Sequence, residues 1–194
     1  VQLKKNKKQL IIGGNIGNTS PAGDSLPILY VYDTVVVLES KDGLRHVPIE
    51  EFIQGPGKTS LKANELIKEI IIKDMDYKGF YYEKVGGRRS DAISKLSFIG
   101  LYNRDESGVI IDLRIAFGAV YKTVVRHREL EKQLIVAMNH EETRHDGNML
   151  SSMVTIISDN TISSCIKGYD AIILPIDDQR SNAKYRKACS ISLL

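Results

Sequence analysis

The residues best suited to do chemistry lie in one stretch, residues 10–29, with the sequence LIIGGNIGNTSPAGDSLPIL. Gly13 and Gly14 permit positive φ angles and place no Cβ between the backbone and a ligand. They fit a cradle in which backbone N–H groups approach an anionic cofactor, although a lone glycine pair is more often a plain turn. Asp24 either complements a helix dipole or binds a sugar hydroxyl, and its spacing leaves both interpretations open.

A second candidate is the basic segment 84–89, in which Lys84 precedes a glycine turn with two arginines. Together with the glycine pair and Asp24, this segment predicts a site for a cofactor that brings its own chemistry. No catalytic side chain is expected, because no Ser/His/Asp or Cys/His arrangement has a recognisable nucleophile turn.

A metal site is not expected either. His140 and His145 are five residues apart, whereas two ligands on one helical face need a spacing of four. Cys165 and Cys189 form no CxxC motif and no disulfide framework, which indicates a reducing compartment. We therefore expect a cytoplasmic protein.

Composition and charge exclude several classes of partner. The 194 residues are 42% hydrophobic and 26% charged, with a net charge of +3, which is ordinary for a globular protein and too weakly basic to indicate nucleic acid. No apolar run approaches the roughly 18 residues that a membrane helix needs, and no signal peptide opens the chain. The first residue is Val1, so we expect a fragment or a processed chain.

Hydrophobic periodicity and turn signals predict two groups of elements with a boundary at residues 74–78. The first group comprises a strand ending at residue 12, a helix from Ser20–Pro21 to residue 32, a hairpin of strands 34–40 and 44–47, a short helix 49–53 and a central strand 64–73. The second comprises strands 79–85, 96–104 and 109–120 and a brief helix 90–95. From residue 123 onwards the chain is expected to be helical, with helices at 129–138, 149–158, 161–166 and 182–193 and a break near residues 159–160.

Five blocks occur in order along nearly the whole chain. They are GGNIGNTSPAGD (13–24), GLRHVPIEEF (43–52), GKT with NELIKEI (57–70), KVGGRRSDAI (84–93) and PIDDQRSNAKYR (175–186). Together they resemble motifs of the FAD-binding subunits of molybdenum hydroxylases, a family that includes xanthine dehydrogenases and the medium subunit of aerobic carbon monoxide dehydrogenase.

The resemblance implies an α+β fold in which residues 1–76 are the C-terminal part of an FAD-binding α/β domain. Residues 77–194 would be the flavoprotein C-terminal domain, with a three-stranded antiparallel sheet and a helical bundle. It also implies FAD as cofactor, and iron–sulfur and molybdopterin subunits as partners. Electrons would pass from the iron–sulfur partner through FAD to NAD or another acceptor.

Carried over by matching position, the resemblance implies a set of FAD-binding residues. Gly13, Gly14 and Asn15 would face the ribityl–pyrophosphate region, Asp24 would bind hydroxyls, and Lys84 would stabilise negative charge on the reduced ring. The complete expected set is Ile11, Ile12, Gly13, Gly14, Asn15, Ser20, Asp24, Ile67 and Lys84.

Two departures from the family pattern support an alternative. Ile11 stands where the family has Thr or Ser, and the family's opening lobe with its phosphate loop has no counterpart in this sequence. The alternative is a truncated, non-catalytic remnant or interaction module that keeps the fold and binds FAD weakly or not at all. A third and more distant option is an unrelated small-nucleotide-binding α+β protein.

Overall fold

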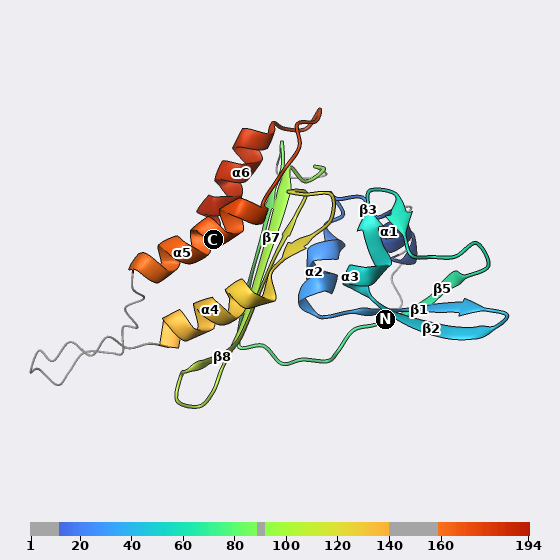
Figure 1. Cartoon of the computed structure of the whole chain (residues 1–194), viewed down its shortest axis with the longest axis horizontal. Helices are drawn as coiled ribbons and strands as arrows, with labels where there is room; N and C mark the ends of the chain where they lie inside the picture. The colour runs from blue at the N-terminus through green and yellow to red at the C-terminus, as the bar shows by residue number, and fades with distance from the viewer. Residues whose placement is uncertain (1–11, 89–91, 140–158) are drawn as a thin grey trace, which may run out of the picture.

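The computed structural model describes residues 12–88, 92–139 and 159–194, and it has the α+β class that the sequence predicts. Within these residues the strands form two antiparallel sheets and one short hairpin, and all helices pack on the two sheets (Figure 1). The predicted helix 149–158 and the histidine pair lie outside the described residues.

The first sheet has the strand order β2-β1-β5, with β1 (Val35–Ser40), β2 (Gly43–Pro48) and β5 (Leu66–Ile71). β1 and β2 form the predicted hairpin, whose turn ends at Gly43 with a φ of 125°. The strand predicted over 64–73 is present as β5, but its predicted central position is wrong. β5 lies at the edge of the sheet and its residues are mostly exposed, because β1 is the strand that is paired on both sides.

The second sheet has the order β6-β7-β8-β9. Its long strands β6 (Gly79–Val85), β7 (Leu96–Arg104) and β8 (Ile110–Gly118) occur where the sequence predicts them. The fourth strand, β9 (Val125–Arg126), corrects the prediction of three strands followed by helix from residue 123. Two residues carry no periodicity of their own, so only pairing with β8 and burial of Val125 define this strand.

The helices lie on both faces of the second sheet (Figure 1). One face is covered by α4 (Arg128–Asn139), α5 (Asp159–Ile172) and α6 (Ala183–Ser192), and the other face packs on α2 (Ser25–Val31). The remaining elements are α1 (Ile12–Asn18), α3 (Ile49–Phe52), β3 (Ile53–Gly55) and β4 (Lys58–Thr59).

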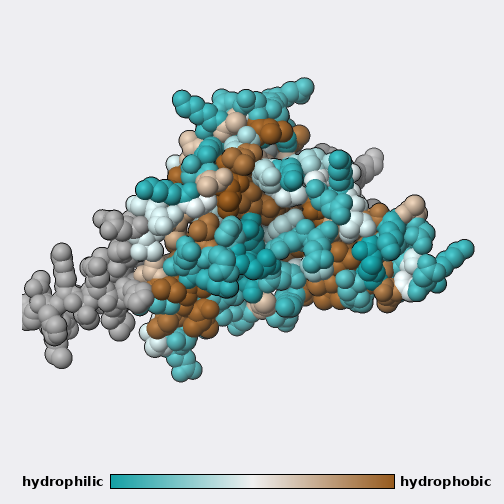
Figure 2. Space-filling view, viewed as in Figure 1, coloured by the Kyte–Doolittle hydropathy of each residue, from teal (hydrophilic) through white to brown (hydrophobic). Residues whose placement is uncertain are grey.

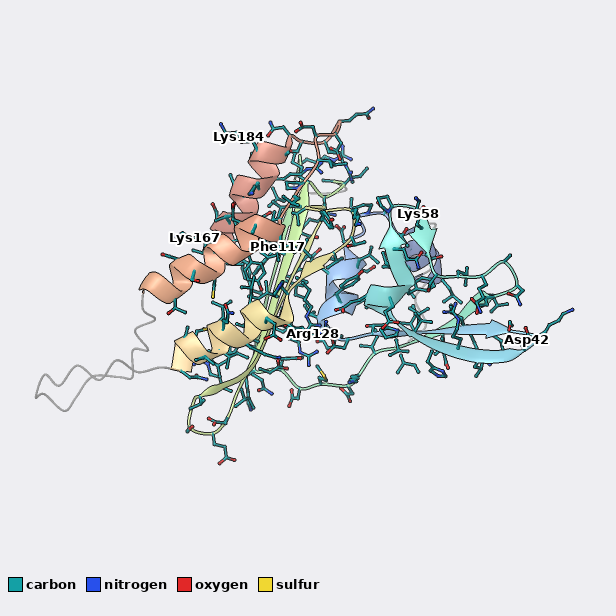
Figure 3. All side chains as sticks on the ribbon, viewed as in Figure 1. Asp42, Lys58, Phe117, Arg128, Lys167 and Lys184 are labelled. Atoms are coloured by element: carbon teal, nitrogen blue, oxygen red, sulfur yellow. The ribbon has the colours of Figure 1, made fainter. Side chains whose placement is uncertain are left out.

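Successive side chains of β7 and β8 point to opposite faces of the sheet. The interior is therefore divided into two cores, one on each face. Phe98 and Phe117 face the helices, where the Phe117 ring lies 5.7 Å from that of Tyr169 (Figure 3). Ile99 and Ala116 face α2 and share a core with the first sheet. This core includes side chains from both sides of the predicted boundary at residues 76 and 77, and the division into two domains stays a prediction.

The largest error of the sequence prediction is at the glycine pair. The structure has no strand and turn there but a seven-residue helix, α1, whose Ile16 is fully buried. Burial of Ile16 and packing of α1 on β5 outweigh the poor helix propensity of glycine. Nor does a helix begin at Ser20–Pro21: the Ser20 carbonyl accepts from Gly23 N at 2.8 Å in a turn, and α2 begins only at Ser25.

Two further helix predictions are corrected. The described part of the segment 90–95 is not helical, and it leads directly into β7. The predicted break near residues 159–160 is the beginning of α5, which runs to Ile172 without interruption. The helix 161–166 is thus the middle of a longer one.

One carboxylate joins α2 to the second sheet and α4. Asp33 follows the C-terminus of α2 with a φ of 48°, and its side chain accepts from Arg114, from Arg126 at 2.7 Å and from Arg128 at 2.9 Å. These arginines come from β8, β9 and α4, and Arg128 is labelled in Figure 3. Burial acts to raise the pKa of Asp33, but the three guanidinium groups hold that pKa below its ordinary value of 3.8.

The depressed pKa of Asp33 predicts acid sensitivity. Because the pKa in the folded state lies below the value in the unfolded chain, the stabilisation is present above about pH 4 and is lost as the pH falls through the folded-state pKa. We expect Asp33→Asn to lower the free energy of unfolding at pH 7 by about 1–3 kcal/mol, since it removes a partly buried negative partner. In urea unfolding between pH 3 and pH 7, the free energy of unfolding of Asp33→Asn should fall less in acid than that of the wild type.

Asp42→Asn is the matched control, because Asp42 lies exposed in the β1–β2 turn (Figure 3). Parallel stability curves for wild type and Asp33→Asn over the whole pH range would contradict the role given to Asp33.

A second prediction concerns the close approach of β8 to α2. A Cβ at Gly118 would lie 2.8 Å from Pro27 Cγ and 2.4 Å from Ser97 Oγ. Gly118→Ala therefore has to push α2 away from the sheet, and we expect a loss of about 1–3 kcal/mol in thermal or urea unfolding. Gly87→Ala is the control, because a Cβ there meets no atom of the described part of the chain within 4 Å. Equal stabilities of the two variants would show that the contact is not tight.

Candidate cofactor site

Two of the predicted site residues lie in direct contact. Asp24 immediately precedes α2, and its Oδ2 lies 2.6 Å from Nζ of Lys84 on β6. The other carboxylate oxygen, Oδ1, accepts a hydrogen bond from Ser94 Oγ. Sixty residues of sequence separate Asp24 from Lys84, so only the packing of α2 on the second sheet brings them together.

A third predicted residue joins the same group through a neighbour. Ser25, the first residue of α2, donates from its hydroxyl to Asn15 Oδ1 on α1 at 2.6 Å. Because Ser25 directly follows Asp24, the N-terminal end of α2 connects Asn15 with Lys84. Ile67 lies on the other flank of α1, where a Cβ on Gly17 would be 3.7 Å from its Cδ1.

The charges of this group are partly open to solvent. The side chains of Asp24 and Lys84 are 42% and 33% exposed, and an ion pair of this exposure contributes only about 0–1 kcal/mol to stability. Burial, with a smaller effect of the Asp24 carboxylate, raises the pKa of the adjacent Tyr82 to about 12, so this phenol stays neutral at physiological pH. The ion pair therefore adds little to stability and remains accessible to a ligand.

The space beside α1 fits a cofactor that approaches the backbone. A Cβ built on either Gly13 or Gly14 meets no atom within 4 Å, so no packing inside the described chain requires glycine there. The group joined to α1 through Asn15 offers a carboxylate acceptor at Asp24, an ammonium donor at Lys84 and the Asn15 amide. This donor set suits a ligand that carries both hydroxyl groups and negative charge.

The remaining expected residues have different outcomes. Ile12 begins α1 and is 42% exposed. Ser20 forms the turn described above, and within the described residues no hydrogen bond or ion pair joins it to the Asp24 group. Ile11 lies outside the described residues. Ser25 and Ser94 were not expected, since neither has a sequence signal that distinguishes it from other serines.

One cavity of the described chain has an apolar lining. A cavity of about 370 Å³ lies between the second sheet and helices α4 and α5, with an apolar lining that includes Leu113, Leu134 and Cys165. Burial raises the pKa of the Cys165 thiol, which keeps it protonated and unreactive.

Figure 2 shows further hydrophobic surface at the C-terminal end of α4, beside the grey atoms.

The described residues offer neither a metal-binding cluster nor a membrane-spanning helix. These residues contain no group of three or more His, Cys, Asp and Glu side chains arranged to hold a metal ion. None of the helices in this part of the chain is long and apolar enough to cross a membrane.

Comparison with known proteins identifies the family. Residues 7–72 match the model of the FAD binding domain in molybdopterin dehydrogenase. Over 154 residues the chain is 30% identical to the glyceraldehyde dehydrogenase medium chain of Sulfolobus acidocaldarius, covering 79% of this chain and 54% of that relative. The chain belongs to the FAD-binding subunits of molybdenum hydroxylases. The nicotinate dehydrogenase FAD-subunit of Eubacterium barkeri is also 30% identical, over 68% of this chain and 46% of the relative.

Solved structures give the same fold for this flavoprotein family. Carbon monoxide dehydrogenase from Hydrogenophaga pseudoflava superposes with a TM-score of 0.72 at 24% identity, over 94% of this chain and 57% of that one. The enzyme from Oligotropha carboxidovorans gives 0.74 at 22% identity, with the same coverage of both chains. The chain spans about half the length of the curated relatives it matches.

The glycine pair yields a prediction that separates binding from stability. Gly14→Ala should leave the fold unchanged or stabilise it by up to about 1 kcal/mol, because alanine is the better helix former and its Cβ meets no atom of the described residues within 4 Å. The same methyl group would occupy the space through which we expect FAD to approach the backbone, so FAD binding should weaken about tenfold or more. Urea unfolding and flavin fluorescence titration measure the two effects.

Gly17→Ala is the control in the same helix, because its Cβ would make only an ordinary contact with Ile67. Unchanged FAD affinity in Gly14→Ala would return the glycine pair to a purely structural role.

Proposed function

We propose that this chain is part of the FAD-binding subunit of a molybdopterin-dependent dehydrogenase or hydroxylase, acting in electron transfer. Electrons pass from an iron–sulfur subunit, which receives them from a molybdopterin subunit, through FAD to NAD or another acceptor. The observation that carries the proposal is the contact between Asp24 and Lys84, which the adjacent Ser25 joins to Asn15 on α1, within a chain of this family.

The side chains of the site fit the parts of FAD. Bound FAD supplies the redox chemistry, as a carrier of one or two electrons. The Asp24 carboxylate accepts hydrogen bonds from cofactor hydroxyls, and the open backbone at Gly13 and Gly14 allows the anionic portion to come close. Lys84 places a positive charge at the site, where it favours the reduced and more negative form of the ring.

The partners and compartment are part of the same proposal. Medium-chain and FAD-subunit relatives are named as components of larger enzymes, which supports assembly with separate iron–sulfur and molybdopterin subunits. Cys165 and Cys189 are free cysteines, which fits a reducing cytoplasm. The substrate is selected in the molybdenum subunit.

The family relationship and the Asp24–Lys84 contact favour a flavoprotein over a non-catalytic interaction module. An interaction module needs the fold and a docking surface, but it has no need of a carboxylate, an ammonium and an open glycine backbone at one place. A flavin spectrum of the chain together with its neighbouring subunits distinguishes the two, since only the flavoprotein retains the yellow cofactor after desalting.

Asp24→Ala tests the proposed role directly. Loss of charged hydrogen bonds to cofactor hydroxyls should weaken FAD binding in the assembled complex by about tenfold to a hundredfold. Stability should fall by about 1–3 kcal/mol, because the exposed Asp24–Lys84 pair contributes little, whereas the buried Ser94 hydroxyl loses its acceptor. Fluorescence titration with FAD measures the affinity, and Asp42→Ala at the remote β1–β2 turn is the control. Equal affinity in Asp24→Ala and wild type would reduce Asp24 to a structural residue.

A further inference from the structure

Ser94 is a polar residue whose burial is explained by a single contact. It lies in the irregular segment before β7, and it is 0% exposed while its neighbour Ile93 is 65% exposed. Its hydroxyl donates to Asp24 Oδ1. A buried hydroxyl without a partner is destabilising, so this hydrogen bond accounts for a serine in the interior at this position.

The contact divides the Asp24 carboxylate between two donors. Ser94 holds Oδ1 from the buried side, and Lys84 contacts Oδ2 from the more exposed side. Asp24 occupies the N-cap position of α2, where an aspartate usually accepts from the backbone of the first turn, yet its side chain makes no capping hydrogen bond. Ser94 and Lys84 therefore orient the carboxylate toward the second sheet instead of toward its own helix.

We propose that Ser94 is a positioning residue of the cofactor site, which fixes the Asp24 carboxylate in the orientation that FAD hydroxyls meet. This inference rests on the proposed function, because it assumes that Asp24 contacts FAD. Ser94 itself is buried behind Asp24 and acts only through it. Without the Ser94 hydroxyl, the 42% exposed Asp24 side chain regains rotational freedom, and cofactor binding has to restrict that freedom again.

The test compares FAD affinity in the assembled complex for wild type, Ser94→Ala, Asp24→Ala and the double variant. We expect Ser94→Ala to weaken FAD binding about threefold to tenfold. In the Asp24→Ala background the same change should have no further effect, because a residue that acts through Asp24 has nothing left to orient. An additive effect in the double variant overturns the proposal.

Ser190→Ala is the matched control for the loss of a buried serine. Ser190 is also 0% exposed and makes one buried hydrogen bond, to the Arg186 carbonyl at 2.7 Å within α6. It should lower the melting temperature without changing FAD affinity. Ser94→Cys keeps nearly the same volume with a weak donor, and should reproduce the loss of affinity if Ser94→Ala does not fold.

The outcomes separate this inference from the proposed function. If the wild-type complex takes up no FAD, the proposed function fails. If Asp24→Ala weakens binding while both folded Ser94 variants bind like wild type, only the positioning role of Ser94 fails.

Discussion

The arrangement of this chain depends on the Asp33 carboxylate and the arginines that surround it. Asp33 adopts a left-handed conformation at the end of α2, where glycine or asparagine is usual, and a non-glycine residue is strained there. The hydrogen bonds from Arg114 and Arg126 offset this strain. The same guanidinium groups donate to carbonyls in the last turn of α2, at Val31 and Tyr30, and so satisfy the end of the helix.

α2 is therefore held at both of its ends by the second sheet. The contacts at its C-terminal end are more buried than those at its N-terminal end. Its C-terminal end is fixed by the partly buried cluster around Asp33, in which the Arg126 side chain is only 5% exposed. Its N-terminal end carries Asp24, whose partners Lys84 and Ser94 come from the sheet and the segment before it. Because the Asp33 cluster anchors the C-terminal end of α2, the contacts of Asp24 at the N-terminal end can be more exposed and weaker. This division suits a site that has to exchange internal contacts for contacts with a ligand.

Long elements with strong patterns were predicted well, because their patterns arise from their own residues. The strands β6 and β7 and the hairpin at Asp42-Gly43 are examples, and Asp24 and Lys84 were expected from the family resemblance. β9 and Ser94 were not expected, because each is defined by a partner distant in sequence: β9 by pairing with β8 and Ser94 by the Asp24 carboxylate. The helix α1 was predicted as a strand and turn, since two glycines locally favour a turn and only the burial of Ile16 reverses that preference.

Gly13 and Gly14 have a different meaning in a helix than in a turn. In a turn, glycine is explained by a backbone conformation that other residues avoid, and no ligand is needed to account for it. Neither residue has a positive φ in α1, and a Cβ on either one would meet no atom of the described chain within 4 Å. Each glycine destabilises the helix by about 1 kcal/mol relative to alanine, and neither the backbone nor the packing requires it. A local rule broken without structural compensation is characteristic of functional sites. A glycine pair in a helix is therefore stronger support for a bound ligand at this position than the same pair in the expected turn would have been.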